Sequence, residues 1–129
     1  MIVVDTSAAL EFLADLEHGS WVRQRLESAG SVHAPHLLDV EFLGALRRLV
    51  WERRMPQSRA TAAIAALVDF DVTRHAHLPL LARIWDLRTN LSAADAAFVA
   101  LAEGLGADLV TIDGRLGRAP GIRATVLVP

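Results

Sequence analysis

Several residue types are absent from this 129-residue sequence, and each absence excludes a kind of chemistry. There is no cysteine, so disulfides and thiolate metal sites are excluded, and carboxylates and five histidines remain the only strong metal ligands. All 13 basic residues are arginine. Without lysine the chain has neither a P-loop, which places a lysine on the phosphates, nor Schiff-base chemistry.

Long apolar runs are absent as well. No uncharged apolar run approaches the ~20 residues that a membrane helix needs, and Asp5 interrupts the N-terminal apolar run far too early for a signal peptide. We therefore expect a cytoplasmic protein with no membrane contact, in which residues 1–129 form one domain. Hydrophobic residues make up 53% of the sequence, which predicts that a partner covers part of the surface and that the protein is not a monomer.

The opening stretch organises the rest of the chain. Residues 2–4 are β-branched and apolar, which is typical of a strand buried in a parallel sheet. Asp5 follows at the carboxyl end of that strand, where open α/β sheets bind ligands. Thr6 and Ser7 lead into an apolar pattern at helical spacing, so Asp5 is either a helix cap or a site residue.

Strands and helices alternate along the remainder of the sequence. Helices are expected at 20–29, 37–54, 58–70, 78–88 and from Ser92, and strands at 32–34, 71–73, 108–112 and 125–128. This order predicts an α/β fold with a mainly parallel central sheet flanked by helices, and right-handed crossovers place all strand-end acids on one edge. The five histidines have no zinc-site spacing, and we assign them to surface or loop positions.

The expected helix 37–54 carries two apolar stripes, which predicts two packing partners. One partner is the sheet, and the other is a second subunit or a bound peptide, with Trp51 as an anchor. Glu41 lies at the edge between the stripes. It is either a solvated glutamate near Arg48 or a carboxylate that follows the boundary of the buried face.

Two further acids occupy positions like that of Asp5. Asp95 stands three residues after Ser92, as in a capping box, yet it shares a helix face with Phe98 and should point inward. An inward carboxylate is costly unless a cation or hydrogen-bond donors meet it. Asp113 either belongs to a turn with Gly114 or repeats the pattern of an apolar strand followed by an acid.

If the strands pair as expected, Asp5, Glu41, Asp95 and Asp113 meet at one edge of the sheet. Four crowded carboxylates repel one another, so the cluster makes physical sense only around cations. Oxygen ligands without sulfur favour Mg²⁺ or Mn²⁺. The formal net charge of −2 is unfavourable for a bare nucleic-acid binder, whereas two bound divalent cations bring it to +2.

This order of acids resembles the PIN domain, and in particular the VapC toxins of VapBC toxin–antitoxin modules. The resemblance spans the chain and rests on VVDTSA, APHLLDVEFLGALRRL, LSAADAAFVALAEGLGADLVT and TIDGRLGRAPG. It implies a metal-dependent endoribonuclease whose catalytic and metal-binding residues are the four acids, with Thr6 or Ser7 and Thr111 in support. One departure concerns substrate packing, because many relatives carry an aromatic residue where this chain has Ala94.

The resemblance also implies a homodimer that is neutralised by a small antitoxin with a helix and an extended basic tail. In such a site the metal activates a water and stabilises the leaving oxygen, while the carboxylates act mainly as ligands for one or two ions. Which carboxylate takes the proton is left open. Arg88, Arg115 and Arg118 flank the acids in sequence and are candidates to hold the RNA backbone.

Two alternatives compete with a toxin. One is a PIN-type nuclease that acts on DNA or in RNA maturation outside a toxin pair; the compact length of the chain favours a toxin. The other is a noncatalytic binding module that retains only the fold. The presence of all four acids argues against this second alternative. The target RNA and the antitoxin are not specified by these residues.

Overall fold

A five-stranded, wholly parallel sheet runs through the middle of the protein, in the order β3-β2-β1-β4-β5. The computed structural model describes residues 1–129. The strands are β1 (Ile2–Val4), β2 (Val32–Pro35), β3 (Thr73–His75), β4 (Asp108–Val110) and β5 (Val126–Leu127). The predicted α/β fold with a parallel sheet is therefore confirmed.

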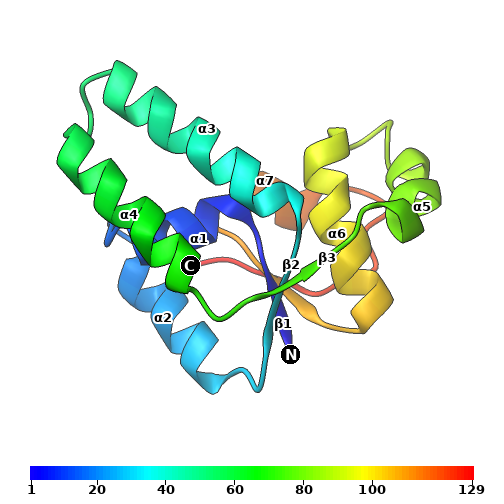
Figure 1. The fold of residues 1–129 in the computed structure, drawn as a ribbon. Helices are drawn as coiled ribbons and strands as arrows, with labels where there is room; N and C mark the ends of the chain where they lie inside the picture. The colour runs from blue at the N-terminus through cyan, green and yellow to red at the C-terminus, as the bar shows by residue number, and fades with distance from the viewer.

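Helices cover the sheet on both sides. They are α1 (Thr6–Leu13), α2 (Gly19–Ser28), α3 (Leu37–Trp51), α4 (Gln57–Asp69), the 3₁₀ turn η1 (Leu78–Leu80), α5 (Leu81–Asp86), α6 (Ala93–Leu105) and α7 (Gly114–Arg118). Figure 1 shows α1 to α4 gathered on one side of the sheet and α5 and α6 on the other, with α3 and α4 side by side. None of these helices has the length and hydropathy needed to cross a membrane.

The core forms around β1 and α6, the two most apolar segments. All three residues of β1 are buried, because β2 and β4 flank the strand on both edges. In α6 every residue from Ala96 to Ala102 is buried, so this helix is enclosed on all sides. Small alanine side chains let the neighbouring elements approach closely. Helix α3 contributes only one buried stripe, made of Leu38, Phe42 and Leu46.

Several expected boundaries differ from the structure. The third strand lies at Thr73–His75 and not at 71–73, because its pairing with β2 sets its place. Pro35 does not stop β2 but ends it as a member of the strand. The short helix α7 is not among the helices expected from the sequence. It forms because Asp113 accepts a hydrogen bond from the Arg115 amide at its start.

The assignment of all five histidines to surface or loop positions is wrong for two of them. His33 and His75 lie on the paired strands β2 and β3, and their rings are joined by a 2.9 Å hydrogen bond between Nδ1 of His33 and Nε2 of His75. The Ser31 hydroxyl contacts the other ring nitrogen of His33 at 2.9 Å. Burial and the neighbouring His75 lower the pKa of His33, which favours a neutral His33 ring.

Candidate active site

The end of β1 is the focus of the site. Val4 on β1 stands opposite Val110 on β4, and the Asp5 amide donates to the Val110 carbonyl at 3.1 Å. Because the strands are parallel and β1 is central, the residues that follow β1 and β4 emerge at the same edge of the sheet. Asp5 and Asp113 therefore come from neighbouring strand ends, as the sequence predicts.

Asp5 caps a helix and also lines a pocket. Its Oδ1 accepts hydrogen bonds from the Ala8 amide at 2.9 Å and from the Ser7 hydroxyl at 2.7 Å, so the side chain caps α1. It is also buried, with only 7% of its surface exposed. Burial raises the pKa of Asp5, and the negative charge of Asp95 raises it further, against the lowering effect of the Thr111 and Ser7 hydroxyls and the Ala8 amide. A nearby cation would reverse this penalty.

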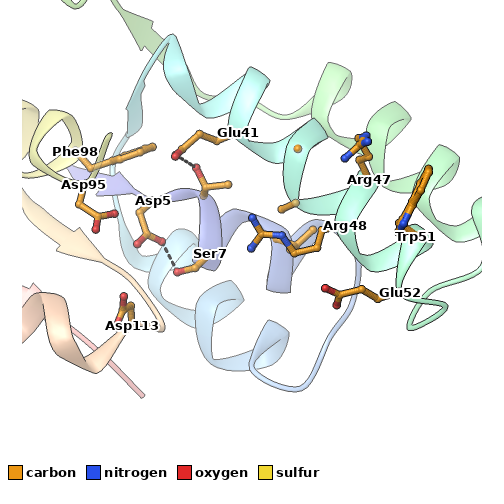
Figure 2. Close-up of a pocket in the computed structure, with 14 residues that line it drawn as sticks. Asp5, Ser7, Glu41, Arg47, Arg48, Trp51, Glu52, Asp95, Phe98 and Asp113 are labelled. Atoms are coloured by element: carbon orange, nitrogen blue, oxygen red, sulfur yellow. Dashed lines mark hydrogen bonds between the residues drawn. The ribbon is translucent and has the colours of Figure 1, made fainter. Parts of the chain in front are cut away.

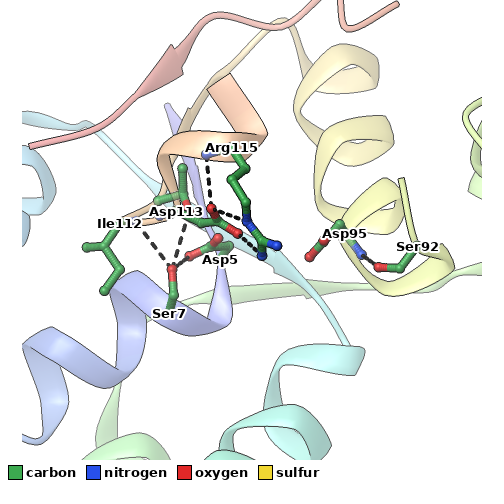
Figure 3. Close-up of polar contacts among 8 residues, drawn as sticks. Asp5, Ser7, Ser92, Asp95, Ile112, Asp113 and Arg115 are labelled. Carbon is green, nitrogen blue, oxygen red and sulfur yellow. Dashed lines mark hydrogen bonds and ion pairs between the residues drawn. The ribbon is translucent and has the colours of Figure 1, made fainter. Parts of the chain in front are cut away.

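Two hydroxyl residues tie Asp5 to the end of β4. The Ser7 hydroxyl that binds Asp5 also accepts from the Ile112 amide at 3.2 Å and lies 3.3 Å from the Thr111 hydroxyl. Thr111 is fully buried, and its hydroxyl accepts from the Asp113 amide at 3.0 Å. Figure 3 shows this network joining the two strand ends. Ser7 and Thr111 thus position the two aspartates.

Glu41 reaches the same site from the side of α3. Its Oε1 accepts a 2.7 Å hydrogen bond from the hydroxyl of Thr6, the first residue of α1 (Figure 2). The glutamate is half-buried and has no ion-pair partner, so it is not the solvated glutamate beside Arg48 that an isolated helix suggests. The contact fixes a carboxylate at the boundary between α3 and α1.

Asp95 stands in the first turn of α6. Ser92 caps this helix as predicted, because its hydroxyl accepts from the Asp95 amide at 3.1 Å. The second half of a capping box is missing, since the Asp95 carboxylate makes no hydrogen bond back to Ser92. The carboxylate instead lines the pocket that Asp5 lines. The cap and the inward carboxylate are therefore both features of this helix start.

Asp113 is held by an arginine of its own helix. The Arg115 guanidinium binds both carboxylate oxygens, with Nε 3.1 Å from Oδ1 and Nη2 2.9 Å from Oδ2. This hydrogen-bonded guanidinium keeps the pKa of Asp113 below its ordinary value, and Arg118 adds a weaker electrostatic effect in the same direction. Arg115 itself is largely exposed. Its side chain places a positive charge at the rim of the acidic cluster.

The four acids converge on one pocket of about 700 Å³. No three of them are close enough, in their present rotamers, to hold one metal ion. The donor set nevertheless fits a hard divalent cation, since it consists of oxygen ligands and includes a buried aspartate with a raised pKa. Glu41 and Asp113 at present bind Thr6 and Arg115 respectively.

The arginines named from the sequence are not all at this pocket. Arg115 lines a second hollow of about 320 Å³ that shares Asp95 and Asp113 with the first. Arg88 lines neither hollow, because its guanidinium lies over the Trp85 ring at 4.5 Å. The charge of Arg118 helps to lower the pKa of Asp113, but Arg118 also lines neither hollow.

Sequence reasoning missed the far end of the main pocket, where Arg47, Arg48 and Trp51 line its wall. The helical spacing from Glu41 holds a signal for two of them. Arg48 and Trp51 follow that residue by seven and ten positions, which places them on the same side of a helix. These side chains extend the pocket away from the acids along α3, as Figure 2 shows.

Comparison with known proteins places this geometry in context. Residues 2–122 match the PIN domain. Ribonuclease VapC9 of Mycobacterium tuberculosis is 46% identical over 116 residues, which span 90% of this chain and 88% of that protein. Ribonuclease VapC12 of the same species is 38% identical over 126 residues, or 98% and 97% of the two chains. The crystal structure of VapBC2 from Rickettsia felis, bound to a promoter DNA fragment, has a similar fold, with a TM-score of 0.72. The match covers 99% of this chain and 98% of that one, at 13% sequence identity.

Proposed function

The chain belongs to the PIN domain family, and from this premise we propose that it is a metal-dependent endoribonuclease, the toxin of a VapBC-type toxin–antitoxin pair. Its relatives VapC9 and VapC12 are named ribonucleases and match nearly the whole chain. RNA is therefore the substrate class that we assign. Mg²⁺ or Mn²⁺ is the cofactor that the oxygen-only donor set fits.

The observation that carries the proposal is the meeting of four carboxylates from four separate parts of the fold. Asp5 follows β1, Glu41 lies on α3, Asp95 begins α6 and Asp113 follows β4, and all four line one pocket. A buried acid such as Asp5, close to further acids, is unfavourable in the free protein. If Asp5 served only to cap α1, the fold would have no structural need for three more carboxylates in the same pocket.

The chain's own residues have separable roles in this hypothesis. The four acids hold the cation, Ser7 and Thr111 orient Asp5 and Asp113, and Thr6 orients Glu41. When bound, a divalent cation supplies Lewis-acid stabilisation of the charge that develops on the scissile phosphate. Arg115, at the rim of the cluster, is placed to approach the phosphate backbone of the substrate once Asp113 turns inward.

The test is cleavage of RNA by the purified protein, free of any partner. We expect cleavage with Mg²⁺ or Mn²⁺, no cleavage in EDTA, and recovery when excess metal is restored. The Asp5→Asn variant, purified in parallel, controls for contaminating nucleases and should be inactive. Equal activity in chelator, or equal activity of the variant, would contradict the proposal.

An antitoxin is the partner that we propose for the apolar hollow between α3 and α4. This hollow of about 600 Å³ is lined by Leu43, Val50 and Ile64 among others. Ile64→Glu should weaken antitoxin binding, whereas Val128→Glu, at a similarly exposed apolar position elsewhere, should not. A small neighbouring reading frame that encodes a basic-tailed DNA-binding protein would identify the partner.

We also propose that the toxin is a homodimer, because several large apolar side chains outside that hollow stay exposed, among them Val40, Val68 and Leu78. Sedimentation velocity of the antitoxin-free protein measures this directly. A monomer at micromolar concentration would contradict the proposal without affecting the proposed ribonuclease activity.

A further inference from the structure

The acid pocket continues as a groove along α3. Glu41, Gly44, Arg48 and Trp51 follow one another at intervals of three, four and three residues, so they share one side of the helix. At 1.5 Å per residue, Glu41 and Trp51 are separated by about 15 Å along the helix axis. The groove is acidic at one end and basic and aromatic at the other (Figure 2).

The basic end has positive charge that no carboxylate neutralises. Neither Arg47 nor Arg48 forms an ion pair, and the Glu52 carboxylate nearby is paired with Arg54 at 3.7 Å. In Figure 2 the Arg48 guanidinium extends from α3 back toward the acidic end. Two unpaired guanidinium groups beside an acidic site suit a ligand that carries negative charge along its length.

Trp51 has one ring face available for stacking. Its side chain is 77% exposed although it lines the groove. The Arg47 guanidinium lies 5.2 Å from the ring centre and covers the other face. An exposed indole is unfavourable in water, and an indole backed by an arginine is a flat platform for an unpaired base.

Gly44 lines the groove without contributing a side chain. It lies in the interior of α3, where glycine is less favourable than alanine. It has no positive φ, and a Cβ added there would meet no atom within 4 Å. Neither backbone conformation nor packing inside the chain therefore requires glycine. The missing side chain leaves the groove open between the acids and Arg48.

We propose that this groove binds the single-stranded RNA next to the scissile phosphate, with a base stacked on Trp51 and a backbone phosphate paired with Arg48. The inference rests on the proposed ribonuclease activity and specifies how that site holds its substrate. Single-strand binders in general combine a positive groove with aromatic platforms. In a chain with a net charge of −2, such a local positive region favours RNA binding.

A protein partner is the alternative occupant, because Trp51 also lines the rim of the hollow between α3 and α4. The two surfaces differ in chemistry. The hollow is mostly apolar, as a partner helix requires, whereas charged side chains line the groove, both arginines and the acids among them. The polar lining favours RNA in the groove and leaves the hollow for protein.

The experiment measures binding of a fluorescently labelled single-stranded RNA by anisotropy in Mg²⁺. All variants are made in the Asp5→Asn background, so that the RNA stays intact. Trp51→Ala should raise the Kd about 10-fold, and Arg48→Ala should lower the slope of log Kd against log salt concentration by about one. Trp85→Ala is the matched control, because Trp85 is 67% exposed and lies under an arginine but lines neither hollow near the acids.

Gly44→Leu tests the groove without removing any contact. It should raise the Kd at least as much as Trp51→Ala does, with an unchanged or higher Tm. Gly104→Leu is its control, since Gly104 also lies inside a helix, with no atom within 4 Å of an added Cβ.

Three outcomes overturn the inference: unchanged RNA affinity of the Trp51 and Gly44 variants, equal losses in the Trp85 and Gly104 controls, or a Trp51→Ala effect on protein partners alone. Wild-type cleavage in Mg²⁺ is measured separately. Its absence refutes the proposed function, whereas its presence with unchanged affinities refutes only the groove.

Discussion

The Thr6 hydroxyl donates a 2.7 Å hydrogen bond to Glu41 Oε1, and this contact joins α1 to α3 at the mouth of the acid pocket. Thr6 is also the residue directly after Asp5, the N-cap of α1, so the position of Thr6 depends on how Asp5 caps the helix. The orientations of two carboxylates from distant parts of the chain are thereby coupled. Loss of one hydroxyl is expected to disturb the acid cluster without altering its charge.

Thr6→Val removes that hydroxyl and keeps the side-chain shape. We expect metal affinity and cleavage rate to fall by about 10- to 100-fold, the usual effect of losing a group that orients a ligand, while unfolding free energy falls by only about 1 kcal/mol. Isothermal titration with Mn²⁺ and thermal unfolding measure the two effects. Thr61→Val removes a hydroxyl bonded to the Gln57 carbonyl on α4 and serves as the control. A loss of stability equal in both variants, with unchanged metal affinity, would assign Thr6 a purely structural role.

Asp5→Asn separates the cap from the charge. Asparagine can still accept the Ala8 amide, so the helix start should survive. Because the folded protein raises the pKa of Asp5, the folded state retains this proton more tightly than the unfolded state does. The contribution of Asp5 to wild-type stability therefore decreases as pH rises above about 4, the ordinary aspartate pKa. The variant lacks this decrease, and it should equal or exceed wild type in Tm at pH 7 in EDTA.

The pH dependence supplies the check on that reasoning. The Tm advantage of Asp5→Asn should shrink as the pH is lowered toward 4, and it should disappear when saturating Mg²⁺ stabilises the wild type. Cleavage should be lost at every pH. A variant that is less stable than wild type at pH 7 without metal would show that the cap dominates at this position.

Three of the four acids were found from sequence because each follows a simple local pattern. Asp5 and Asp113 come after apolar strands, and Asp95 precedes an apolar helix next to its Ser92 cap. The order of parallel strands then brings these positions to one edge of the sheet, and that order can be inferred from alternating strands and helices. Glu41 needed the family resemblance as well, since a single glutamate on a helix has no distinguishing pattern.

Other features had no local signal. The hydrogen bond between His33 and His75 joins residues 42 positions apart, and nothing near either histidine indicates it. The third strand was misplaced because Val72 suggested a strand centre, whereas Val72 lies buried just before the strand and the pairing with β2 begins at Thr73. Arg115 was named as an RNA contact, but its pairing with Asp113 depends on the short helix α7. The glycines in this segment are unfavourable in a helix, so the sequence did not predict it.

Arg115→Gln should free the Asp113 carboxylate. We expect a modest gain in metal affinity at pH 7, of a fewfold, because the lost ion pair is exposed and therefore weak. Since Arg115 keeps the pKa of Asp113 low, that pKa rises in the variant, and metal binding should be lost at a higher pH than in wild type. Mn²⁺ titrations at pH 7 and at pH 5 measure both effects. Arg88→Gln, which lies away from the acids, should change neither, and a similar shift in both variants would indicate a general charge effect.

The last prediction concerns inhibition by the basic tail of an antitoxin. Before metal binds, Asp5, Glu41 and Asp95 form no ion pair, and the pocket is strongly negative. An arginine from the tail can enter as a cation would, because its planar fork binds carboxylates through two parallel hydrogen bonds. The Arg115 contact with Asp113 is an example of that geometry within this chain. Inhibition by the tail should then be competitive with metal.

The measurement is a set of cleavage inhibition curves with an arginine-containing tail peptide at several Mg²⁺ concentrations and constant ionic strength. The half-inhibitory peptide concentration should rise with Mg²⁺, because both cations need the same carboxylates. A peptide with citrulline in place of arginine keeps the shape without the charge, and it should inhibit weakly at every Mg²⁺ concentration. Superimposable curves for the arginine peptide would place the tail in the RNA groove alone, since a ligand there displaces RNA without contacting the carboxylates that bind the metal.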